Sequence, residues 1–214
     1  MGKIIDFLAG QKVLEKKKSK FNEEIKVIRN LAFGTYLQAG GITQSGGVVK
    51  DIWKSTLKEI KKRNKNSIKE CLILGLGGGT LVKLIKEGYP KAKIMGVDID
   101  PIMVELGKKY LGLEKVKIEI TDAYNWVVKN KDRKYDLIFV DLYKGREFPQ
   151  EFNEEKFLKL LIRLLSDHGL IIFNHLYYGE KRSEAVKFGK KLEKVFSKVE
   201  YFYPEANLMF ICQE

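Results

Sequence analysis

The chain has 214 residues with a formal net charge of +12 at pH 7, and 44% of its residues are hydrophobic. That length is sufficient for one α/β domain with a small appendage. No apolar run approaches the roughly 20 residues that span a membrane, and Asp6 interrupts a short N-terminal apolar stretch that would otherwise suggest a signal peptide. We therefore expect a cytoplasmic protein without a membrane partner.

The positive charge comes mostly from lysines scattered through segments that also contain glutamate. A nucleic-acid-binding surface would gather basic and aromatic side chains on one face. Solvated helix faces therefore explain the charge better, and a nucleic-acid partner stays open without being favoured. The two cysteines, Cys71 and Cys212, fall on separate expected strands. Together with two distant histidines they indicate reduced core residues and no metal site.

The first 47 residues are expected to form a β-hairpin or small meander. A short helix is expected around residues 4–8, and residues 11–18 fit a strand less clearly. From Glu23 onward, alternating apolar residues are interrupted by a Phe-Gly turn and by glycine pairs. Such alternation between glycine-rich turns is typical of β-hairpins.

An amphipathic helix is expected next, over residues 48–62, because apolar residues recur there at helical spacing and the remaining face is basic. Residues 64–67 then join this helix to the rest of the chain. We expect two domains on this basis: the N-terminal hairpin region, 1–47, and a Rossmann-like domain, 48–214, of which 48–66 form the leading helix and join.

The following strand, expected at 69–74, runs into a cluster of glycines. Residues 71–80 read Cys-Leu-Ile-Leu-Gly-Leu-Gly-Gly-Gly-Thr, and a helical pattern follows at 80–88. A strand, a tight turn and a helix form the opening unit of a doubly wound α/β sheet. Glycines suit the turn because a Cβ would oppose its backbone angles. They also let a ligand lie against bare N–H groups at a helix N-terminus.

A second apolar run, at 93–98, ends in acids. Asp98 follows Gly75 at roughly the 20-residue spacing at which an acid binds ribose hydroxyls. The dinucleotide fingerprint would need glycine or alanine at position 80 or 82, where Thr80 and Val82 stand. A G-x-G-G-G turn with an acid-tipped second strand instead resembles the S-adenosylmethionine (AdoMet) site of class I methyltransferases and of the related aminopropyltransferases.

The α/β alternation continues to the C-terminus. Further strands are expected at 116–120, 135–141, 170–174, 198–203 and 207–212, helices at 101–111, 153–165 and 181–195, a short helix after Asp122, and a turn at 166–169. Seven strands with a closing antiparallel pair match the class I methyltransferase pattern. The expected fold is therefore α/β, with a Rossmann-like seven-stranded sheet and a small N-terminal β-hairpin appendage.

Ligands of such a sheet bind at the carboxyl ends of its strands. Asp122 follows the third strand of this sheet, where its carboxylate can accept the adenine amino group or cap the next helix, and both roles can coexist. Asp141 ends the fourth strand beside the expected sulfonium, where an acid can hold a cationic amine and accept its proton. His175, just past the fifth strand, is more often incidental than catalytic at such a place. Five aromatic residues at the same edge either wall an acceptor pocket or pack the loops: Tyr143, Phe148, Phe152, Tyr177 and Tyr178.

Taken together, these residues resemble the spermidine synthase-like branch of the AdoMet-binding superfamily. The matching segments are 18–27, 33–34, 37–44, 75–80, 97–101, 121–123 and Asp141. The resemblance implies a β-hairpin domain ahead of a Rossmann-like domain, often in a homodimer, and Asp141 as the catalytic residue. It also implies a set of residues that bind AdoMet or its decarboxylated form: Gln44, Gly75, Leu76, Gly77, Gly78, Gly79, Asp98, Ile99, Asp122 and Ala123.

The departures from that family concern the acceptor. Aminopropyltransferases carry a second aspartate three residues after the catalytic one, where this chain has Lys144, and residues 45–53 replace the family's aromatic-His/Gln-Glu segment. Because a lysine would repel a diamine, methyl transfer from AdoMet to an unidentified small-molecule acceptor is the favoured prediction. The alternatives are a polyamine aminopropyltransferase that uses decarboxylated AdoMet, and a non-catalytic AdoMet-binding protein.

Overall fold

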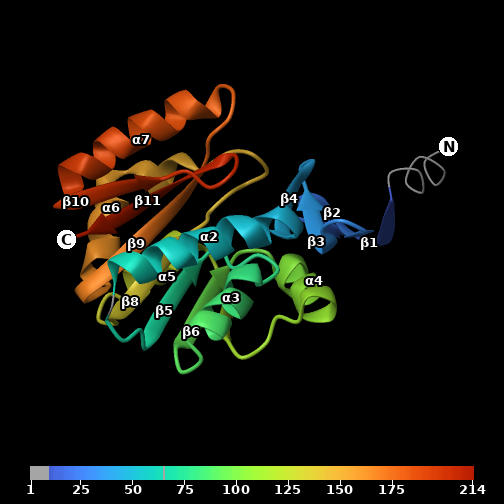
Figure 1. Cartoon of the computed structure of the whole chain (residues 1–214), viewed down its shortest axis with the longest axis horizontal. Helices are drawn as coiled ribbons and strands as arrows, with labels where there is room; N and C mark the ends of the chain where they lie inside the picture. The colour runs from blue at the N-terminus through green and yellow to red at the C-terminus, as the bar shows by residue number, and fades with distance from the viewer. Residues whose placement is uncertain (1–9, 65) are drawn as a thin grey trace.

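The structure, a computed structural model, describes residues 10–64 and 66–214, which form two β-sheets with helices around the larger one (Figure 1). The helix expected around residues 4–8 lies outside the described residues. No helix in the described ranges is long and apolar enough to cross a membrane.

The N-terminal sheet is a four-stranded antiparallel meander in the order β1-β2-β3-β4. Its strands are β1 (Gln11–Ser19), β2 (Glu23–Asn30), β3 (Gly34–Ala39) and β4 (Ile42–Gly46). Ile25 of β2 and Leu37 of β3 are fully buried against Met103 and Leu106, so one face of this sheet packs on the helix α4 (Pro101–Leu111). The sheet (blue in Figure 1) therefore lies directly against the rest of the molecule.

The larger sheet has seven strands in the order β10-β11-β9-β8-β5-β6-β7. The pairs among β5 to β9 are parallel, whereas β11 is antiparallel to both β9 and β10. This confirms the expected Rossmann-like sheet with its closing antiparallel pair. The elements are α2 (Gly47–Arg63), β5 (Glu70–Leu74), α3 (Thr80–Gly88), β6 (Lys93–Asp98), α4 (Pro101–Leu111), β7 (Lys117–Ile120), α5 (Ala123–Lys129), β8 (Tyr135–Val140), the 3-10 helix η1 (Gln150–Asn153), α6 (Glu155–Arg163), β9 (Leu165–Leu176), α7 (Lys181–Val195), β10 (Lys198–Phe202) and β11 (Asn207–Gln213).

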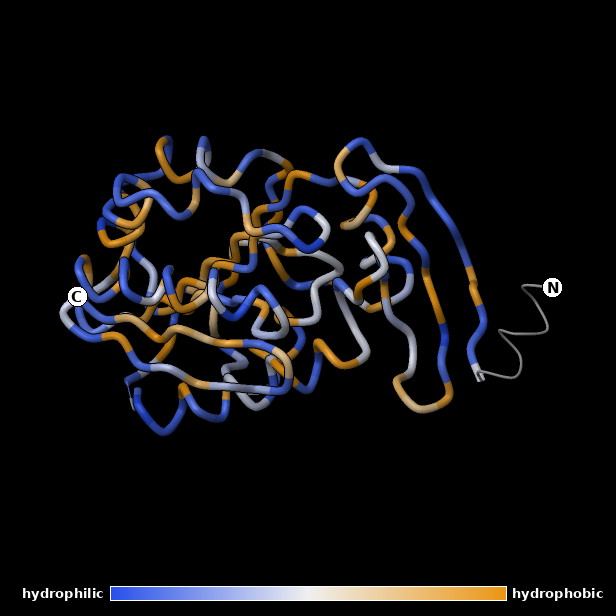
Figure 2. Tube along the Cα trace, turned by 90° about the horizontal axis from the view of Figure 1, so that it is seen from above, coloured by the Kyte–Doolittle hydropathy of each residue, from blue (hydrophilic) through white to orange (hydrophobic). Residues whose placement is uncertain are grey.

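Helices cover both faces of this sheet, as the near-continuous apolar runs of its strands require. Successive side chains of a strand point to opposite faces. Cys71 and Ile73 of β5 accordingly pack against α2 and α3, whereas Leu72 and Leu74 pack on the side of α5, α6 and α7. Figure 2 shows the hydrophobic segments concentrated in the interior and the hydrophilic ones along the periphery.

One local prediction was wrong. The turn expected at 166–169 lies inside β9, which begins at Leu165. Tyr135 of β8 pairs with Leu165, and Leu137 pairs with Leu170. Residues 166–169 therefore form a bulge opposite the single residue Asp136. Asp136 stabilises this bulge because its carboxylate accepts hydrogen bonds from the Ser166 hydroxyl and from two backbone N–H groups at the start of β5.

Candidate active site

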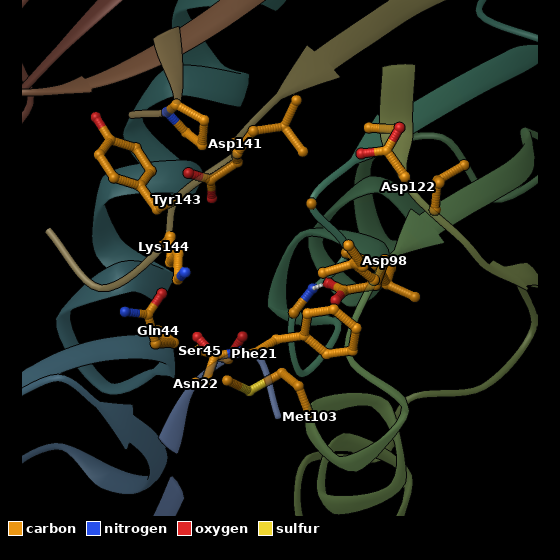
Figure 3. Close-up of a pocket in the computed structure, with 18 of the residues that line it drawn as sticks. Phe21, Asn22, Gln44, Ser45, Asp98, Met103, Asp122, Asp141, Tyr143 and Lys144 are labelled. Carbon is orange, nitrogen blue, oxygen red and sulfur yellow. Dashed lines mark hydrogen bonds between the residues drawn. The ribbon is translucent and has the colours of Figure 1, made fainter. Parts of the chain in front are cut away.

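A cavity of about 290 Å³ opens at the carboxyl ends of β5, β6, β7 and β8, with residues of the N-terminal sheet forming its opposite wall (Figure 3). Strand β5 lies between β6 and β8. From β5 the chain passes through α3 to β6 on one side, and β8, which comes later in the sequence, lies on the other side. This is the topological switch point at which ligands of doubly wound sheets bind. The strand ends at which the sequence predicts a ligand site lie at this same edge.

The glycine turn after β5 is fixed by contacts on both sides. The N–H groups of Gly75 and Leu76 both donate to the carbonyl of Val97 at the end of β6, over 2.9 and 3.1 Å. Gly75 has φ +85°, and a Cβ there would lie 2.0 Å from the Asp141 carbonyl oxygen. No other residue fits this position, because both its backbone angle and the space beside it exclude a side chain.

Gly75, Leu76 and Gly77 line the cavity. Gly78 and Gly79, which the sequence analysis also assigned to cofactor binding, do not. The N–H of Gly78 donates to the Ser45 hydroxyl over 2.7 Å, and Gly79, with φ +86°, begins α3 against the side chain of Leu113. Their role in this structure is to let the N-terminal sheet, the end of α4 and Leu113 beyond it approach the turn.

Asp98 ends β6 at the floor of the cavity. Its carboxylate accepts hydrogen bonds from the Gly77 N–H (2.6 Å) and the Asp100 N–H (2.9 Å), one on each oxygen. Burial raises the pKa of Asp98 to about 6, and those backbone N–H groups limit the rise. Each carboxylate oxygen has a further lone pair, so the group can still accept hydrogen bonds from ligand hydroxyls.

Asp100, two residues further on, has a structural role. It is fully buried and caps α4, where it accepts hydrogen bonds from the N–H groups of Ile102 and Met103. Its second oxygen accepts from the Ser19 hydroxyl and from the Asn22 side-chain amide. Asp100 thereby ties the β1–β2 turn to the wall of the cavity.

Residues Lys20 to Asn22 of that turn line the cavity. Their sequence predicts no site role, because the contact depends on the packing of β1 and β2 against α4. Ser45, Val49, Trp53 and Met103 were missed for the same reason: each lines the cavity from an element whose sequence pattern predicts only packing. No signal in the sequence distinguishes them from ordinary core residues.

The part of the cavity beside β7 and α5 is lined by residues that the sequence predicts to contact adenine. Asp122, Ala123 and Ile99 line the cavity beside one another, together with Thr121. The Asp122 carboxylate accepts from the Asn125 N–H over 2.8 Å, which makes it the N-cap of α5. Its capping role is thus established, and its second oxygen remains available to a ligand amino group.

Asp141 follows β8 on the opposite side of the cavity from Asp98 (Figure 3). One carboxylate oxygen accepts from the Asn174 amide over 2.7 Å, and Asn174 in turn accepts from the Asn207 amide over 2.7 Å. Burial raises the pKa of Asp141 to about 6, although the Asn174 amide and the Trp53 indole act to lower it. A carboxyl group that is held in place and titrates near neutral pH is suited to accept a proton from an amine.

The aromatic residues at this edge divide into two groups. Tyr143 and Phe152 line the cavity, and the Tyr143 hydroxyl accepts from the Leu176 N–H over 2.8 Å. The other three lie outside the cavity lining, with Phe148 packed against core aromatic residues and Tyr177 against Tyr203. Two of these aromatic residues therefore line the cavity, whereas the other three do not.

His175 belongs to the core rather than to the cavity. Its ring lies between those of Phe148 and Phe188, at centroid distances of 4.3 and 4.4 Å, and only 5% of the residue is exposed. Burial lowers the pKa of His175 to about 3, so the imidazole is neutral near pH 7. The interpretation that this histidine is incidental to the site is consistent with its position.

Gln44 and Lys144 meet at the side of the cavity nearest the N-terminal sheet. Both line the cavity, and Figure 3 shows the Lys144 side chain extending toward Gln44. The Gln44 amide donates over 3.5 Å to the Ala39 carbonyl within the N-terminal sheet. This side of the cavity thus carries an amide and a cation, whereas its floor and far wall carry carboxylates.

Comparisons with known proteins agree with this geometry. Residues 50–206 match the spermine/spermidine synthase domain. A polyamine aminopropyltransferase of Prochlorococcus marinus (strain AS9601) is 30% identical over 212 residues, which cover 90% of this chain and 70% of the relative. These names support aminopropyl transfer better than the methyl transfer that the sequence analysis favoured.

Two solved structures share the fold. A probable spermidine synthase from Corynebacterium glutamicum superposes with a TM-score of 0.78 at 17% identity, covering 94% of this chain and 80% of that one. Human methyltransferase-like protein 13, solved in complex with SAH, superposes with a TM-score of 0.61 at 23% identity, covering 78% and 79%.

Proposed function

Because the chain belongs to the spermine/spermidine synthase family, we propose that it transfers an aminopropyl group from decarboxylated AdoMet to an amine. The observation that carries the proposal is the position of Asp141. This carboxyl group, with a raised pKa, faces the cavity that the glycine turn and Asp98 also line. A nucleoside site and a proton acceptor therefore share one cavity.

The nucleoside would lie along the carboxyl ends of β5, β6 and β7. Asp98 would accept hydrogen bonds from the ribose hydroxyls, and the backbone at Gly75 to Gly77 would allow close approach of the sugar and sulfur. Ile99 and Ala123 would pack against the adenine, with Asp122 accepting a hydrogen bond from its amino group. Each of these residues lines the cavity.

At the reacting centre the donor supplies a sulfonium leaving group, so that attack by the amine nitrogen on the adjacent carbon forms a C–N bond while the C–S bond breaks to leave a neutral thioether. Asp141 accepts the proton that the attacking amine loses. The Asn174 amide orients the Asp141 carboxylate, and Asn207 orients Asn174. Alignment of the amine with the sulfonium carbon provides much of the rate enhancement in such a site.

Methyl transfer from AdoMet is the second candidate, and Lys144 is the observation that favours it. Its cationic side chain extends into the cavity. There it would repel the ammonium group of a diamine or of an aminopropyl donor. At about 4 Å and an effective dielectric constant near 20, such a repulsion amounts to about 4 kcal/mol.

Calorimetry with AdoMet and with decarboxylated AdoMet distinguishes the two candidates. We expect decarboxylated AdoMet to bind more tightly, and the protein to convert it with putrescine into spermidine detectable by mass spectrometry. Tighter binding of AdoMet, without spermidine formation, would replace aminopropyl transfer by methyl transfer. Absence of binding by both compounds and by methylthioadenosine, the nucleoside common to them, would refute both candidates.

A further inference from the structure

We propose that Lys144 is a carboxylate-binding residue, so that one of the two molecules meeting at Asp141 carries a carboxylate on the Gln44 side of the cavity. The inference rests on the proposed function, because that function places the reacting centre at Asp141. It adds the chemical class of a ligand group that the cavity selects.

The first observation is that the Lys144 ammonium has no anionic partner of its own. Lys109 and Lys181 pair with Glu15 and Glu147 over 2.7 Å each. Lys144, by contrast, forms no ion pair with any residue in the described ranges, although it lines a cavity that also contains carboxylates. A ligand anion would therefore find this cation uncompensated.

The second observation is that the backbone of Lys144 is held in place. Lys144 and Glu147 form a two-bond backbone bridge, with N···O distances of 2.9 and 3.1 Å, and the Glu147 side chain is bound in turn by Lys181. Gly40, in the β3–β4 turn, packs so closely that a Cβ there would lie 3.2 Å from Gly145. The lysine therefore extends from an ordered loop that the N-terminal sheet supports.

The third observation is that the acids deeper in the cavity already have hydrogen-bond donors. Asp98 accepts from two backbone N–H groups, Asp122 from one, and Asp141 from the Asn174 amide. Glu151 also lines the cavity and is exposed, as Lys144 is, but the two side chains form no ion pair. Lys144 beside the Gln44 amide is thus a pair of hydrogen-bond donors suited to a carboxylate.

Two molecules could bring that carboxylate. AdoMet carries one on its methionine tail, which decarboxylated AdoMet lacks, and the acceptor could be an amino acid rather than a diamine. The binding chemistry is the same in both cases. Two experimental arms separate the sources, with Lys144→Asp as the test variant and Lys91→Asp, an exposed lysine in the turn before β6, as the matched control.

The first arm measures the affinities of AdoMet, decarboxylated AdoMet and methylthioadenosine by calorimetry. The second arm measures kcat/KM, with decarboxylated AdoMet as donor, for putrescine and for 5-aminopentanoate, which replaces one terminal ammonium by a carboxylate. In the second arm we expect the wild type to prefer 5-aminopentanoate over putrescine at least tenfold, and Lys144→Asp to abolish or reverse that preference. A preference for AdoMet in the first arm that is lost in Lys144→Asp would instead place the carboxylate on the donor, and it would replace aminopropyl transfer by methyl transfer. Lys91→Asp should keep the preference of the wild type, and the arm that responds identifies the source.

The binding of methylthioadenosine separates failure of this inference from failure of the proposed function. If methylthioadenosine binds equally to wild type and Lys144→Asp while neither arm shows a carboxylate preference, the nucleoside site stands and the inference is overturned. A carboxylate preference that is absent from the wild type and appears only in Glu151→Gln would also overturn the inference, because Glu151 would then be neutralising Lys144. If methylthioadenosine does not bind the wild type, the proposed function fails and the inference fails with it.

Discussion

The cavity has two halves that the chain builds in different ways. The half proposed to bind the nucleoside, formed by Gly75 to Gly77, Asp98 and Asp122 with their neighbours, comes from one continuous stretch of β-strands and helices between β5 and α5. The half proposed to bind the acceptor, formed around Asp141 and Lys144, draws on β4, α2 and the segment after β8, and the β1–β2 turn lies at the junction of the two halves. Backbone geometry dominates the first half and side-chain identity the second.

This difference shows where such a fold can change its chemistry. In the nucleoside half the bare backbone N–H groups, the positive φ angles and the strand-tip acid constrain one another, so a substitution there disturbs the turn itself. In the acceptor half a side chain such as Lys144 extends from a supported loop and can be replaced without altering the sheet. We therefore expect substitutions in the glycine turn to affect folding and substitutions around Asp141 to affect activity.

The largest effect is expected for Gly75→Ala in the nucleoside half. The new Cβ would lie 2.0 Å from the Asp141 carbonyl oxygen, and the residue would have to keep φ +85°. Because the contact is with backbone that cannot move aside, we expect a loss of more than about 4 kcal/mol in the free energy of unfolding. Urea unfolding monitored by the fluorescence of the buried Trp53 and Trp126 measures this loss.

The matched control is Gly112→Ala. Gly112 has φ +70°, but a Cβ there would meet no atom within 4 Å, so only the cost of the left-handed conformation remains, about 1–2 kcal/mol. Equal losses for the two variants would show that backbone strain alone accounts for the effect. The close packing between the glycine turn and the end of β8 would then not be needed to explain the loss of stability in Gly75→Ala.

The second largest effect is expected for Asp141→Asn in the acceptor half, and it concerns rate rather than folding. Removal of a general base costs roughly 10²- to 10⁴-fold in rate, whereas methylthioadenosine should bind with unchanged affinity because Asp98 and the glycine turn remain. Steady-state kinetics and calorimetry on the same preparation test both statements. A parallel loss of nucleoside affinity would mean that Asp141 belongs to the nucleoside half.

The pH dependence provides an independent test of Asp141. Because the pKa of the folded protein is raised to about 6, wild-type kcat/KM should rise with pH through that value and then level off. The same shift means that ionisation of Asp141 weakens the folded state, so stabilisation present below about pH 4 is lost as the pH rises through 6. Asp141→Asn should therefore melt at a higher temperature than the wild type at pH 8, with a smaller difference at pH 4.

The sequence predicts the strand ends of both halves but not the residues that the N-terminal sheet adds to the cavity. Gly75, Asp98, Asp122 and Asp141 were found because the ends of parallel strands meet at one edge of the sheet, so local patterns are sufficient. Asn22 and its neighbours reach the cavity only through the packing of the N-terminal sheet on α4, which no local pattern encodes. The bulge in β9 escaped prediction for a similar reason, since its stability comes from Asp136 on another strand.

The smallest effect, expected for Asp100→Asn, concerns the junction of the two halves. The Asp100 oxygen that accepts from Ser19 and Asn22 would become an amide nitrogen facing the Asn22 amide, two donors without an acceptor. An unsatisfied buried group of this kind costs about 1–3 kcal/mol, and we expect Asp100→Asn to lose that much in urea unfolding. The exposed control Asp167→Asn should stay within about 0.5 kcal/mol of the wild type.

This variant should also weaken methylthioadenosine binding, by up to about tenfold, because Lys20, Phe21 and Asn22 would no longer be held at the cavity wall. The glycine turn and Asp98 would keep their own contacts, so the remaining affinity reports what the nucleoside half contributes alone. Unchanged affinity in a destabilised Asp100→Asn protein would show that the β1–β2 turn contacts only the acceptor. In that case the boundary between the two halves would run between Asp98 and Asp100, two residues apart in the sequence.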